Sequence, residues 1–555
     1  MIRRNDWGAL DAAPLGRWTP TKTVSVVIPA YGSQAKLDLA LAALAAQSYP
    51  AELTEVVVVD DGSDVPLAAR EPAPAGVKVV RNPEGRWGIA AAVATGVQAS
   101  TGSVVLRLDS DVLASRHHVE AHMRWHHQID YAVVIGKLAF AEIEAEELSP
   151  ETVRDAIETG KGWGLFEGLD VDREWTSKVI RNRDELRRGD IQTFKVANGA
   201  SVSFSRRLYE AAGGVAPDLL LGEDTELSYR FSQQGAAYIA DKAAEAWHIG
   251  ESQMRAAKER GMRYRQPFFA GRVPLLHHHR KPQGVQWRVP MVEVVVDSRG
   301  RSFEAVAATV GSVLAGDRTD VAVNVVGDWP APAAGRYRPL DDPDQDARLA
   351  MELFAADQRV AFTDAVAPTA APVPYRLTLA AGVTLRHDAI EAALDIADKQ
   401  QAGRVNFSRS GQDEPVAVRL DRTAAIGRAR WETGLEDCSD EAVDKVWGLW
   451  WADGDELFGL ADGTAVPWFR PSRIQRELER LRAAEEEQRK LAEKWKKSAS
   501  DARASAAKWE QSARDWERSA AKWRREAEKA GPGERRGPRR IAAGVKRRLK
   551  RLLGR

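Results

Sequence analysis

The chain has 555 residues, which is enough for about three or four folding units and a buried enzymatic core. Lys+Arg and Asp+Glu both number 80, and hydrophobic residues make up 44%, so the composition excludes wholesale disorder and a uniformly polybasic nucleic-acid-binding protein. The single cysteine, Cys438, excludes an intramolecular disulfide framework and favours a reducing compartment. Residues 1–20 lack an apolar signal core, and no apolar run reaches the roughly eighteen residues of a membrane span, so we expect a cytoplasmic protein.

The first part of the chain alternates β-branched runs with segments of helical periodicity. Strands are predicted at 24–29, 56–59, 77–80 and 104–108, and helices at 37–46 and 89–99. This alternation predicts a mainly parallel sheet covered by helices on both faces, with ligands beyond the carboxyl ends of the strands. We assign residues 1–21 to an N-terminal extension and 22–285 to this first domain.

The stretch after residue 290 repeats the pattern faintly. Leu379-Ala-Ala-Gly-Val383 resembles Leu108-Asp-Ser-Asp-Val112, and in each copy a glutamate, Glu391 or Glu120, follows the leucine by twelve positions. Both carboxylates of the first copy are missing from the second. We therefore expect a second α/β domain at 290–470 that is a degenerate copy without a metal site; an unrelated α/β domain with coincidental spacing is the alternative.

A heptad pattern begins at Ile474. One series of residues falls every seven positions, and a series of alanines accompanies it: Ile474, Leu481, Gln488, Trp495, Ala502, Trp509, Trp516 and Trp523 with Ala499, Ala506, Ala513 and Ala520. Tryptophan facing alanine can interdigitate, so 471–530 predicts a coiled coil that joins copies of the chain or docks a partner.

The last segment, 531–555, is basic. Gly531-Pro-Gly533 ends the helix, and the residues that follow carry ten Lys/Arg against one acid, with an apolar stripe at helical spacing. This pattern predicts an amphipathic tail on an anionic membrane surface, at the inner face of the cell membrane. Nucleic-acid binding and a solvated tail are the competing interpretations, and the apolar stripe favours lipid.

Acidic residues follow the predicted strands. Asp109-Ser-Asp111 ends one strand, and carboxylates at this position can bind Mg²⁺ or Mn²⁺ together with substrate phosphate oxygens. Asp60-Asp61 closes another strand, where a carboxylate can accept hydrogen bonds from a base or a ribose. An ordinary turn or helix cap would use the same residue types.

Taken together, these residues resemble the family 2 glycosyltransferases of the GT-A fold. The resemblance covers about residues 22–250 and rests on Val24–Tyr31, Asp60–Ser63, Leu108–Asp111, Asn198–Phe204 with Arg206, Gly213-Gly214, Gly222–Asp224 with Glu226, Leu227 and Arg230, and His248. It implies inverting transfer of a sugar from a nucleotide-diphosphate donor to a hydroxyl, with Mn²⁺ or Mg²⁺ as cofactor.

The resemblance also implies roles for single residues. Asp224 would be the catalytic base, with Glu223 beside it. The nucleotide sugar would lie against Pro29, Tyr31, Asp60, Asp61 and Asp109. The metal ligands would be Asp109, Asp111 and His248.

Two features depart from the family pattern or extend it. Many relatives carry an Arg and an Asn where this chain has Val93 and Ala94, and Arg86 or Arg107 could compensate for the lost donor contact. On the acceptor side, we expect Trp163 and Asn198. His118, His122 and His126 share a helical face, for which we favour polar packing at the rim of the acceptor cleft over a metal site.

The sequence thus predicts a glycosyltransferase of cell-surface polysaccharide or glycolipid assembly, acting on a glycan or a lipid-linked acceptor. A non-catalytic, membrane-associated scaffold that recruits enzymes through its coiled coil is the alternative, supported by the missing Arg and Asn.

Overall fold

The computed structural model describes residues 1–169, 171–173, 175–197, 199–250, 257–280, 285–332, 337–408, 418–461 and 473–529. The chain divides into two compact units, Met1–Val466 and Pro467–Arg555. Each unit is described by itself.

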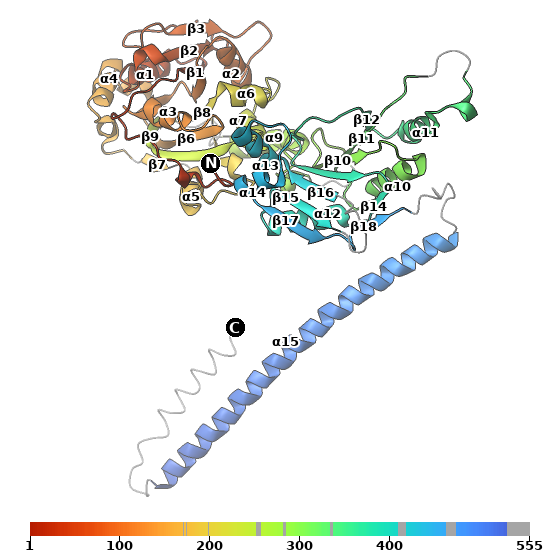
Figure 1. Cartoon of the computed structure of the whole chain (residues 1–555). Coiled ribbons are helices and arrows are strands. Elements are labelled where there is room, and N and C mark those ends of the chain that lie inside the picture. The colour runs from red at the N-terminus through yellow and green to blue at the C-terminus, as the bar shows by residue number, and fades with distance from the viewer. Residues whose placement is uncertain are drawn as a thin grey trace. The chain divides into compact units, whose positions relative to one another are not determined.

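The first unit begins with a mixed, mainly parallel sheet (Figure 1). Its strands are β1 (Val24–Ala30), β2 (Thr54–Asp60), β3 (Lys78–Arg81), β4 (Val104–Leu108), β5 (Val112–Ala114), β6 (Ala132–Ala141), β7 (Val171–Arg173), β8 (Ser201–Ser205) and β9 (Ala237–Ile249). They lie in the order β3-β2-β1-β4-β8-β6-β9-β5, with β7 beside β6. Every residue of β1 and β4 is buried, as expected for parallel strands covered on both faces. The predicted α/β fold is confirmed.

A second sheet follows within the same unit. Its strands are β10 (Val292–Asp297), β11 (Val321–Val326), β12 (Val360–Thr363), β13 (Tyr375–Ala380), β15 (Arg404–Ser408), β16 (Val418–Arg422) and β17 (Leu449–Asp453), and a separate pair joins β14 (Val383–Leu385) to β18 (Phe458–Leu460). The order β12-β11-β10-β13-β16-β15-β17 repeats β3-β2-β1-β4-β8-β6-β9 strand for strand. The directions agree as well, because β16 runs antiparallel to both neighbours, as β8 does, and all other neighbours in the two series are parallel.

Helices cover both sheets. In the first domain they are α1 (Gln34–Ala45), α2 (Ile89–Gln98), α3 (His118–His126), α4 (Pro150–Glu158), α5 (Trp175–Asn182), α6 (Arg206–Ala211), α7 (Glu223–Gln233) and α9 (Lys258–Arg272); in the second they are α10 (Phe303–Leu314), α11 (Gln345–Phe354), α12 (Ala389–Lys399), α13 (Thr423–Thr433) and α14 (Asp440–Val446). Short 3-10 helices are η1 (Trp7–Ala9), η2 (Ala51–Leu53), η3 (Ala145–Glu147), η4 (Gly162–Phe166), η5 (Thr193–Val196), η6 (His277–His279) and η7 (Pro339–Asp341). The α2 helix is rich in alanine, so it lies close to β1 and β2.

The N-terminal residues link the two domains. Ile2 is fully buried beside Tyr131, and the Arg428 guanidinium donates hydrogen bonds to the backbone oxygens of Ile2 and Arg4. Arg428 is itself fully buried, and its guanidinium lies over the Tyr131 ring at 4.6 Å. Residues 1–5 are thus an integral part of the interface between the two domains.

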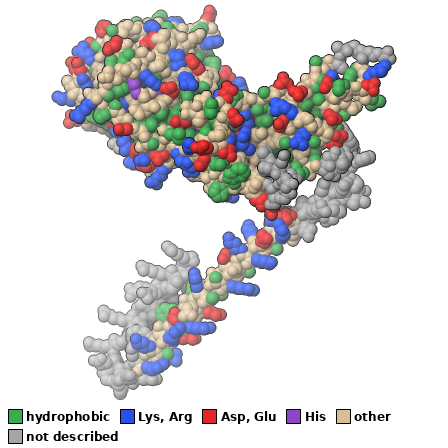
Figure 2. Space-filling view, in the orientation of Figure 1, with side chains coloured by type: hydrophobic (Ala, Val, Ile, Leu, Met, Phe, Trp, Pro, Cys, Tyr) green, Lys and Arg blue, Asp and Glu red, His purple; other side chains and the backbone are tan. Residues whose placement is uncertain are grey.

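The second unit contains the helix α15 (Arg473–Lys529). The described tryptophans of the heptad pattern are exposed on it: Trp495 and Trp509 are each 70% exposed and Trp516 is 64% exposed. Figure 2 shows blue and red side chains interspersed along α15 and over the visible face of the first unit. Among the described helices, none has both the length and the apolar character that crossing a bilayer requires. The predicted basic tail, 531–555, lies outside the described residues.

Candidate active site

The site begins where β1 and β2 end. Pro29 is a buried residue of β1, and Tyr31, just beyond the strand, is 67% exposed. The Asp61 carboxylate accepts hydrogen bonds from the Gly88 backbone and from Asn82. Asp60, in contrast, is buried, and its carboxylate accepts hydrogen bonds from the backbone of Ser63 and Leu67.

Asp60 and Asp61 therefore have different surroundings. The hydrogen bonds to Asp60 lower the pKa of its carboxyl against the effect of burial, and they fix the turn after β2. Asp61 links this turn to the start of α2, which follows Gly88.

The loop between β4 and β5 carries Asp109 and Asp111. Backbone hydrogen bonds hold it on both sides: the Asp109 N–H donates to the Ala200 oxygen, and the Ile249 N–H donates to the Asp111 oxygen. Val112 pairs with His248 across the antiparallel strands β5 and β9. Residues more than a hundred positions apart thus meet at this loop.

The side chains converge as the sequence predicted for Asp111 and His248. His248 Nε2 lies 3.3 Å from Asp111 Oδ1, and Lys36 Nζ lies 3.3 Å from Asp111 Oδ2. The Phe140 ring packs against the imidazole, with the ring centroids 4.9 Å apart. Lys36 was not predicted from the sequence, because no motif ties the single lysine of α1 to Asp111.

Asp109 lies close to the same groups. Burial raises the pKa of its carboxyl, as do the neighbouring carboxylates of Asp111 and Asp224, whereas Arg107 and His248 lower it. Asp109 Oδ1 is buried without a hydrogen-bond partner, and Arg107 Nη2 lies 3.7 Å away. The acid cluster thus includes Asp109, Asp111 and Asp224.

Glu223 and Asp224 open the helix α7 after Gly222, which has a positive φ of 86°. A Cβ at Gly222 would lie 2.5 Å from the Phe269 ring, so the turn requires glycine in both conformation and space. Asp224 Oδ2 accepts a hydrogen bond from the Gly199 N–H, and Asp224 Oδ1 accepts one from the Thr225 N–H.

Glu223 points into the core instead. Its Oε1 lies 2.9 Å from Arg107 Nη1, and both side chains are buried. Burial raises the pKa of Glu223 to about 7, although Arg107 acts in the opposite direction. Arg107 is therefore a buried cation paired with Glu223 and not a surface cation. Val93 is buried in the same region, and Arg86 is exposed.

The residues fit a divalent cation in part. Asp111 and His248 lie together, and two buried atoms next to them, Asp109 Oδ1 and His248 Nδ1, have no hydrogen-bond partner. Within the described residues, no group of three His, Cys, Asp or Glu side chains has the spacing of a complete metal site. Two protein ligands suffice when a diphosphate supplies further oxygens, as is usual for Mg²⁺. Asp111 and His248 are the residues that would hold the ion.

Of the two predicted acceptor residues, the structure describes one, Trp163. Trp163, on η4, is 43% exposed, and its indole N–H donates to Glu245 Oε2 while its ring meets Trp247 edge-on. Because successive side chains of a strand point to opposite faces, Trp247 and the Trp163 ring that meets it lie on the other face of β9 from His248. Asn198 lies outside the described residues.

The predicted position of the α3 histidines at a cleft rim was wrong. His118, His122 and His126 do not line a cleft rim, because all three are fully buried against β8 and β9. Their ring nitrogens make hydrogen bonds with Ser201 and Ser203 of β8. Burial lowers the pKa of His118 to about 4 and that of His126 to about 3, so the imidazoles are neutral and structural.

Residues 25–185 match the family model described as glycosyl transferase family 2. No curated protein sequence matches the chain. Similar solved structures include the mannosyltransferase PcManGT from Pyrobaculum calidifontis in complex with GDP-Man and Mn²⁺, at 19% identity over 47% of this chain and 66% of that chain, with a TM-score of 0.31.

A second similar structure is GalNAc-T7 with UDP, GalNAc and Mn²⁺, at 16% identity over 45% of this chain and 51% of that chain, also with a TM-score of 0.31. The chain spans less than two thirds of either structure's own chain. The family match supports a glycosyltransferase domain in the N-terminal part of the chain, and it includes Asp61, Asp109 and Asp111.

Proposed function

We propose that the protein is an inverting glycosyltransferase that moves a sugar from a nucleotide-diphosphate donor to a hydroxyl acceptor. The observation that carries this proposal is the convergence of Asp109, Asp111 and His248 at the strand ends, with Asp224 at the start of α7 beside them. Paired acids next to a metal-compatible imidazole supply the two functions that the reaction needs: charge stabilisation and proton acceptance.

In this proposal Asp224 accepts the proton of the acceptor hydroxyl. The backbone N–H groups of Gly199 and Thr225 hold its carboxylate in place, so that one position of the oxygens is presented to the acceptor. A divalent cation, Mn²⁺ or Mg²⁺, would neutralise the departing diphosphate. Tyr31 and Asp61 lie at the neighbouring strand ends, where they would contact the nucleotide.

The rest of the chain suggests where the reaction takes place. The basic, amphipathic pattern of 531–555 motivates an anionic membrane surface, at the inner face of the cell membrane, and hence a glycan or lipid-linked acceptor in cell-surface polysaccharide or glycolipid assembly. The exposed tryptophans of α15 motivate a homo-oligomer or a helical partner.

A donor assay tests the proposal. Release of nucleoside diphosphate from UDP-, GDP- and dTDP-sugars with Mn²⁺ should be detectable for at least one donor and should fall at least a hundredfold in Asp111→Asn and in Asp224→Asn. Asp395→Asn is the control, because Asp395 is exposed on α12. Undiminished turnover in both site variants would overturn the assignment.

The scaffold alternative retains one supporting observation. Where the first domain has Asp109 and Asp111, the corresponding strand end of the second domain has Ala380 and Gly382. Leu460 pairs with Val383 as His248 pairs with Val112, so the histidine is replaced as well. The second domain thus fits a supporting role. A scaffold would show no Mn²⁺-dependent binding of any nucleotide sugar.

A further inference from the structure

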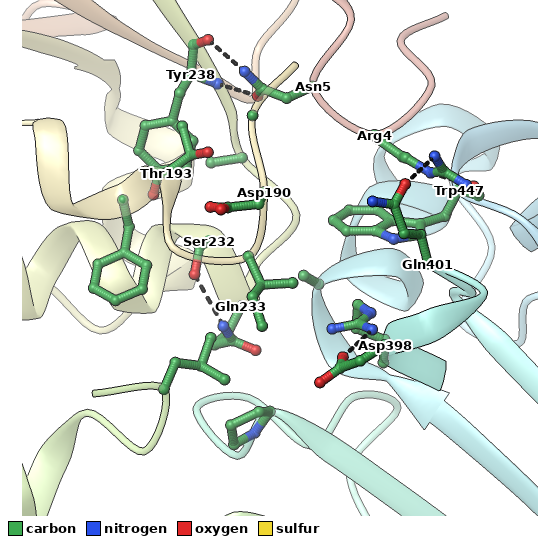
Figure 3. A pocket seen from close by; sticks show the side chains of 18 residues that line it. Arg4, Asn5, Asp190, Thr193, Ser232, Gln233, Tyr238, Asp398, Gln401 and Trp447 are labelled. Atoms are coloured by element: carbon green, nitrogen blue, oxygen red, sulfur yellow. Dashed lines mark hydrogen bonds and ion pairs between the residues drawn. The ribbon is translucent and has the colours of Figure 1, made fainter. Parts of the chain in front are cut away.

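A cavity of about 280 Å³ lies between the two α/β domains, away from the acid cluster. One wall comes from the first domain and includes Thr193, Asp190 and Tyr238; the other comes from the second domain and includes Trp447 and Gln401. Arg4, from the N-terminal segment, lies next to Trp447 and Gln401 (Figure 3). The proposed transfer reaction uses none of these residues.

The charges around this cavity do not cancel. Each of its two carboxylates has its own arginine: Asp190 is bound through both oxygens by Arg183, and Asp398 Oδ1 lies 2.8 Å from Arg422 Nη2. Arg4 has no such partner among the described residues. Its guanidinium donates only to neutral acceptors, Gln401 Oε1 at 2.6 Å and the Trp447 oxygen at 3.2 Å.

Arg4 therefore supplies an uncompensated positive charge. Burial lowers the pKa of its guanidinium, and so do the neighbouring cations Arg3 and Arg422. Arginine stays protonated nevertheless, so the charge remains and favours an anion. A carboxylate or a phosphate matches the planar donor geometry of a guanidinium.

A second polar group in the cavity also lacks a partner. Thr193 is 2% exposed, and its hydroxyl is buried without a hydrogen bond. Leaving a buried hydroxyl without a hydrogen-bond partner destabilises the fold. Because this oxygen has no exposed surface, a ligand hydroxyl or carbonyl in the cavity would reach it only after the side chain turns.

The backbone around the cavity is strained. Arg4 and Gln401, whose side chains are joined, both have positive φ, at 54° and 49°. Non-glycine residues with positive φ are strained and cluster at ligand sites. Asn5, also in the cavity wall, donates a hydrogen bond to the backbone of Leu186, which is a third residue with positive φ.

We propose that this cavity binds a hydroxylated organic anion about the size of one sugar ring, a sugar acid or a sugar phosphate, and thereby links the two domains. Arg4 binds the acidic group, the Thr193 hydroxyl turns to bond to an oxygen of the ring, and Leu275 and the Trp447 indole pack against its carbon face. The volume sets the size, because a nucleotide sugar needs considerably more space than 280 Å³.

Calorimetric titration of the full chain tests the proposal. All titrations use the Asp111→Asn variant with EDTA, so that the proposed donor site does not contribute to the signal. A negative result for this cavity is therefore distinct from a negative result for the proposed transfer reaction. The probes are glucose 6-phosphate, glucuronate, glucose and inorganic phosphate. We expect saturable binding of at least one of the two sugar anions, at one site per chain, and at least tenfold weaker binding of glucose and phosphate. The sugar anion that binds identifies the acidic group.

Two variants locate the site. Thr193→Val keeps the side-chain shape and removes only the hydroxyl, and Arg4→Gln removes the charge; each should weaken binding at least tenfold. Arg17→Gln, at an exposed arginine, should leave it unchanged. Absence of saturable binding by both sugar anions would overturn the proposal, as would equal affinity in the Thr193→Val and Arg4→Gln variants. Phosphate binding as tightly as the sugar anions would overturn the assignment of a ring-sized ligand.

Discussion

Arg107 and Glu223 form a buried ion pair directly behind the acid cluster. Arg107 comes from β4, two residues before Asp109, and Glu223 immediately precedes Asp224 on α7. The pair thus fixes the distance between the strand that carries the metal-binding loop and the helix that carries the proposed base. Gly199 packs directly against the Arg107 guanidinium, since a Cβ at this position would lie 2.0 Å from the guanidinium carbon.

Removing one partner of this pair should destabilise the fold. In Arg107→Met, Glu223 would lose the cation that opposes the effect of burial, and a buried charge without a partner costs about 3–5 kcal/mol. Urea unfolding should show this loss. The double variant Arg107→Met/Glu223→Met should recover most of it, because no charge is then left unpaired. If the double variant is as unstable as the sum of the single variants, the pair contributes no coupling.

Lys36 allows a second test at the scale of single residues. Its ammonium lies 3.3 Å from Asp111 Oδ2, on the carboxylate that would bind the cation. In Lys36→Met this competing positive charge is absent, so Mn²⁺ should bind the donor-free protein several-fold more tightly. Titration followed by calorimetry measures the change, with Lys258→Met of α9 as the control. Unchanged or weaker Mn²⁺ binding would argue against competition at Asp111.

At the scale of elements, α3 contributes three imidazoles that are buried in neutral form. The ordinary histidine pKa is about 6.5, so an unfolded chain takes up protons on these groups as the pH falls below that value. In the folded chain, burial lowers the pKa of His118 to about 4 and that of His126 to about 3. Both imidazoles therefore stay neutral until the pH falls to those values. Their contribution to stability is therefore fully present above pH 6.5 and is lost as the pH falls.

Stability should consequently drop between pH 7 and pH 5, by about 2 kcal/mol for each imidazole. Denaturant unfolding at the two pH values measures the loss. His126→Gln keeps a polar atom near Ser203 and cannot take up a proton. This variant should therefore lose less stability between pH 7 and pH 5, by about the amount that one imidazole contributes. His387→Gln, at an exposed histidine, should behave as the parent protein does. An equal pH dependence in His126→Gln and the parent would contradict the assignment.

The elements that could be predicted from the sequence are the ones with uniform surroundings. Strands such as β1 and β4 are buried on both faces and therefore read as apolar runs. The long strand β9 does not read as one apolar run, because Asp241 interrupts the pattern. Its carboxylate is bound by Arg124 and by the Trp125 indole, and such a tertiary contact leaves no mark in local periodicity.

The candidate site, too, could be predicted from the sequence only in part. Asp109 and Asp111 could be assigned because strand ends gather at one edge of a sheet. The contact between Arg107 and Glu223 joins residues 116 positions apart, and neither side chain belongs to a motif that predicts the other. The buried positions of the α3 histidines could not be predicted either, since their partners are two serines of β8.

For the whole molecule, the repeated strand order has a consequence for donor binding. The second domain lacks the two aspartates and the histidine at the corresponding positions, so it should bind no metal-bound diphosphate. Calorimetry with the donor and Mn²⁺ should therefore give one site per chain, and Asp111→Asn should abolish it. A stoichiometry of two, or a site that remains in Asp111→Asn, would show that the second domain binds the donor.

The helix α15 bears on the state of the molecule in solution. Its tryptophans at 495, 509 and 516 are more than half exposed, and they lie at intervals of seven or fourteen residues, which places them on one side of a supercoiled helix. Burying one such indole removes about 150–250 Å² from water, so three of them per chain strongly favour association. We therefore expect the full chain to sediment as an oligomer.

Replacement of all three tryptophans by serine should weaken this association at least a hundredfold, which corresponds to about 3 kcal/mol. Sedimentation velocity over a range of concentrations measures the change. Leu340→Ser serves as the control, because Leu340 is an 88% exposed apolar residue outside α15. An oligomer that persists in the triple variant would place the contact on another surface. A parent chain that stays monomeric at high concentration would instead favour a helical partner of different sequence for this face.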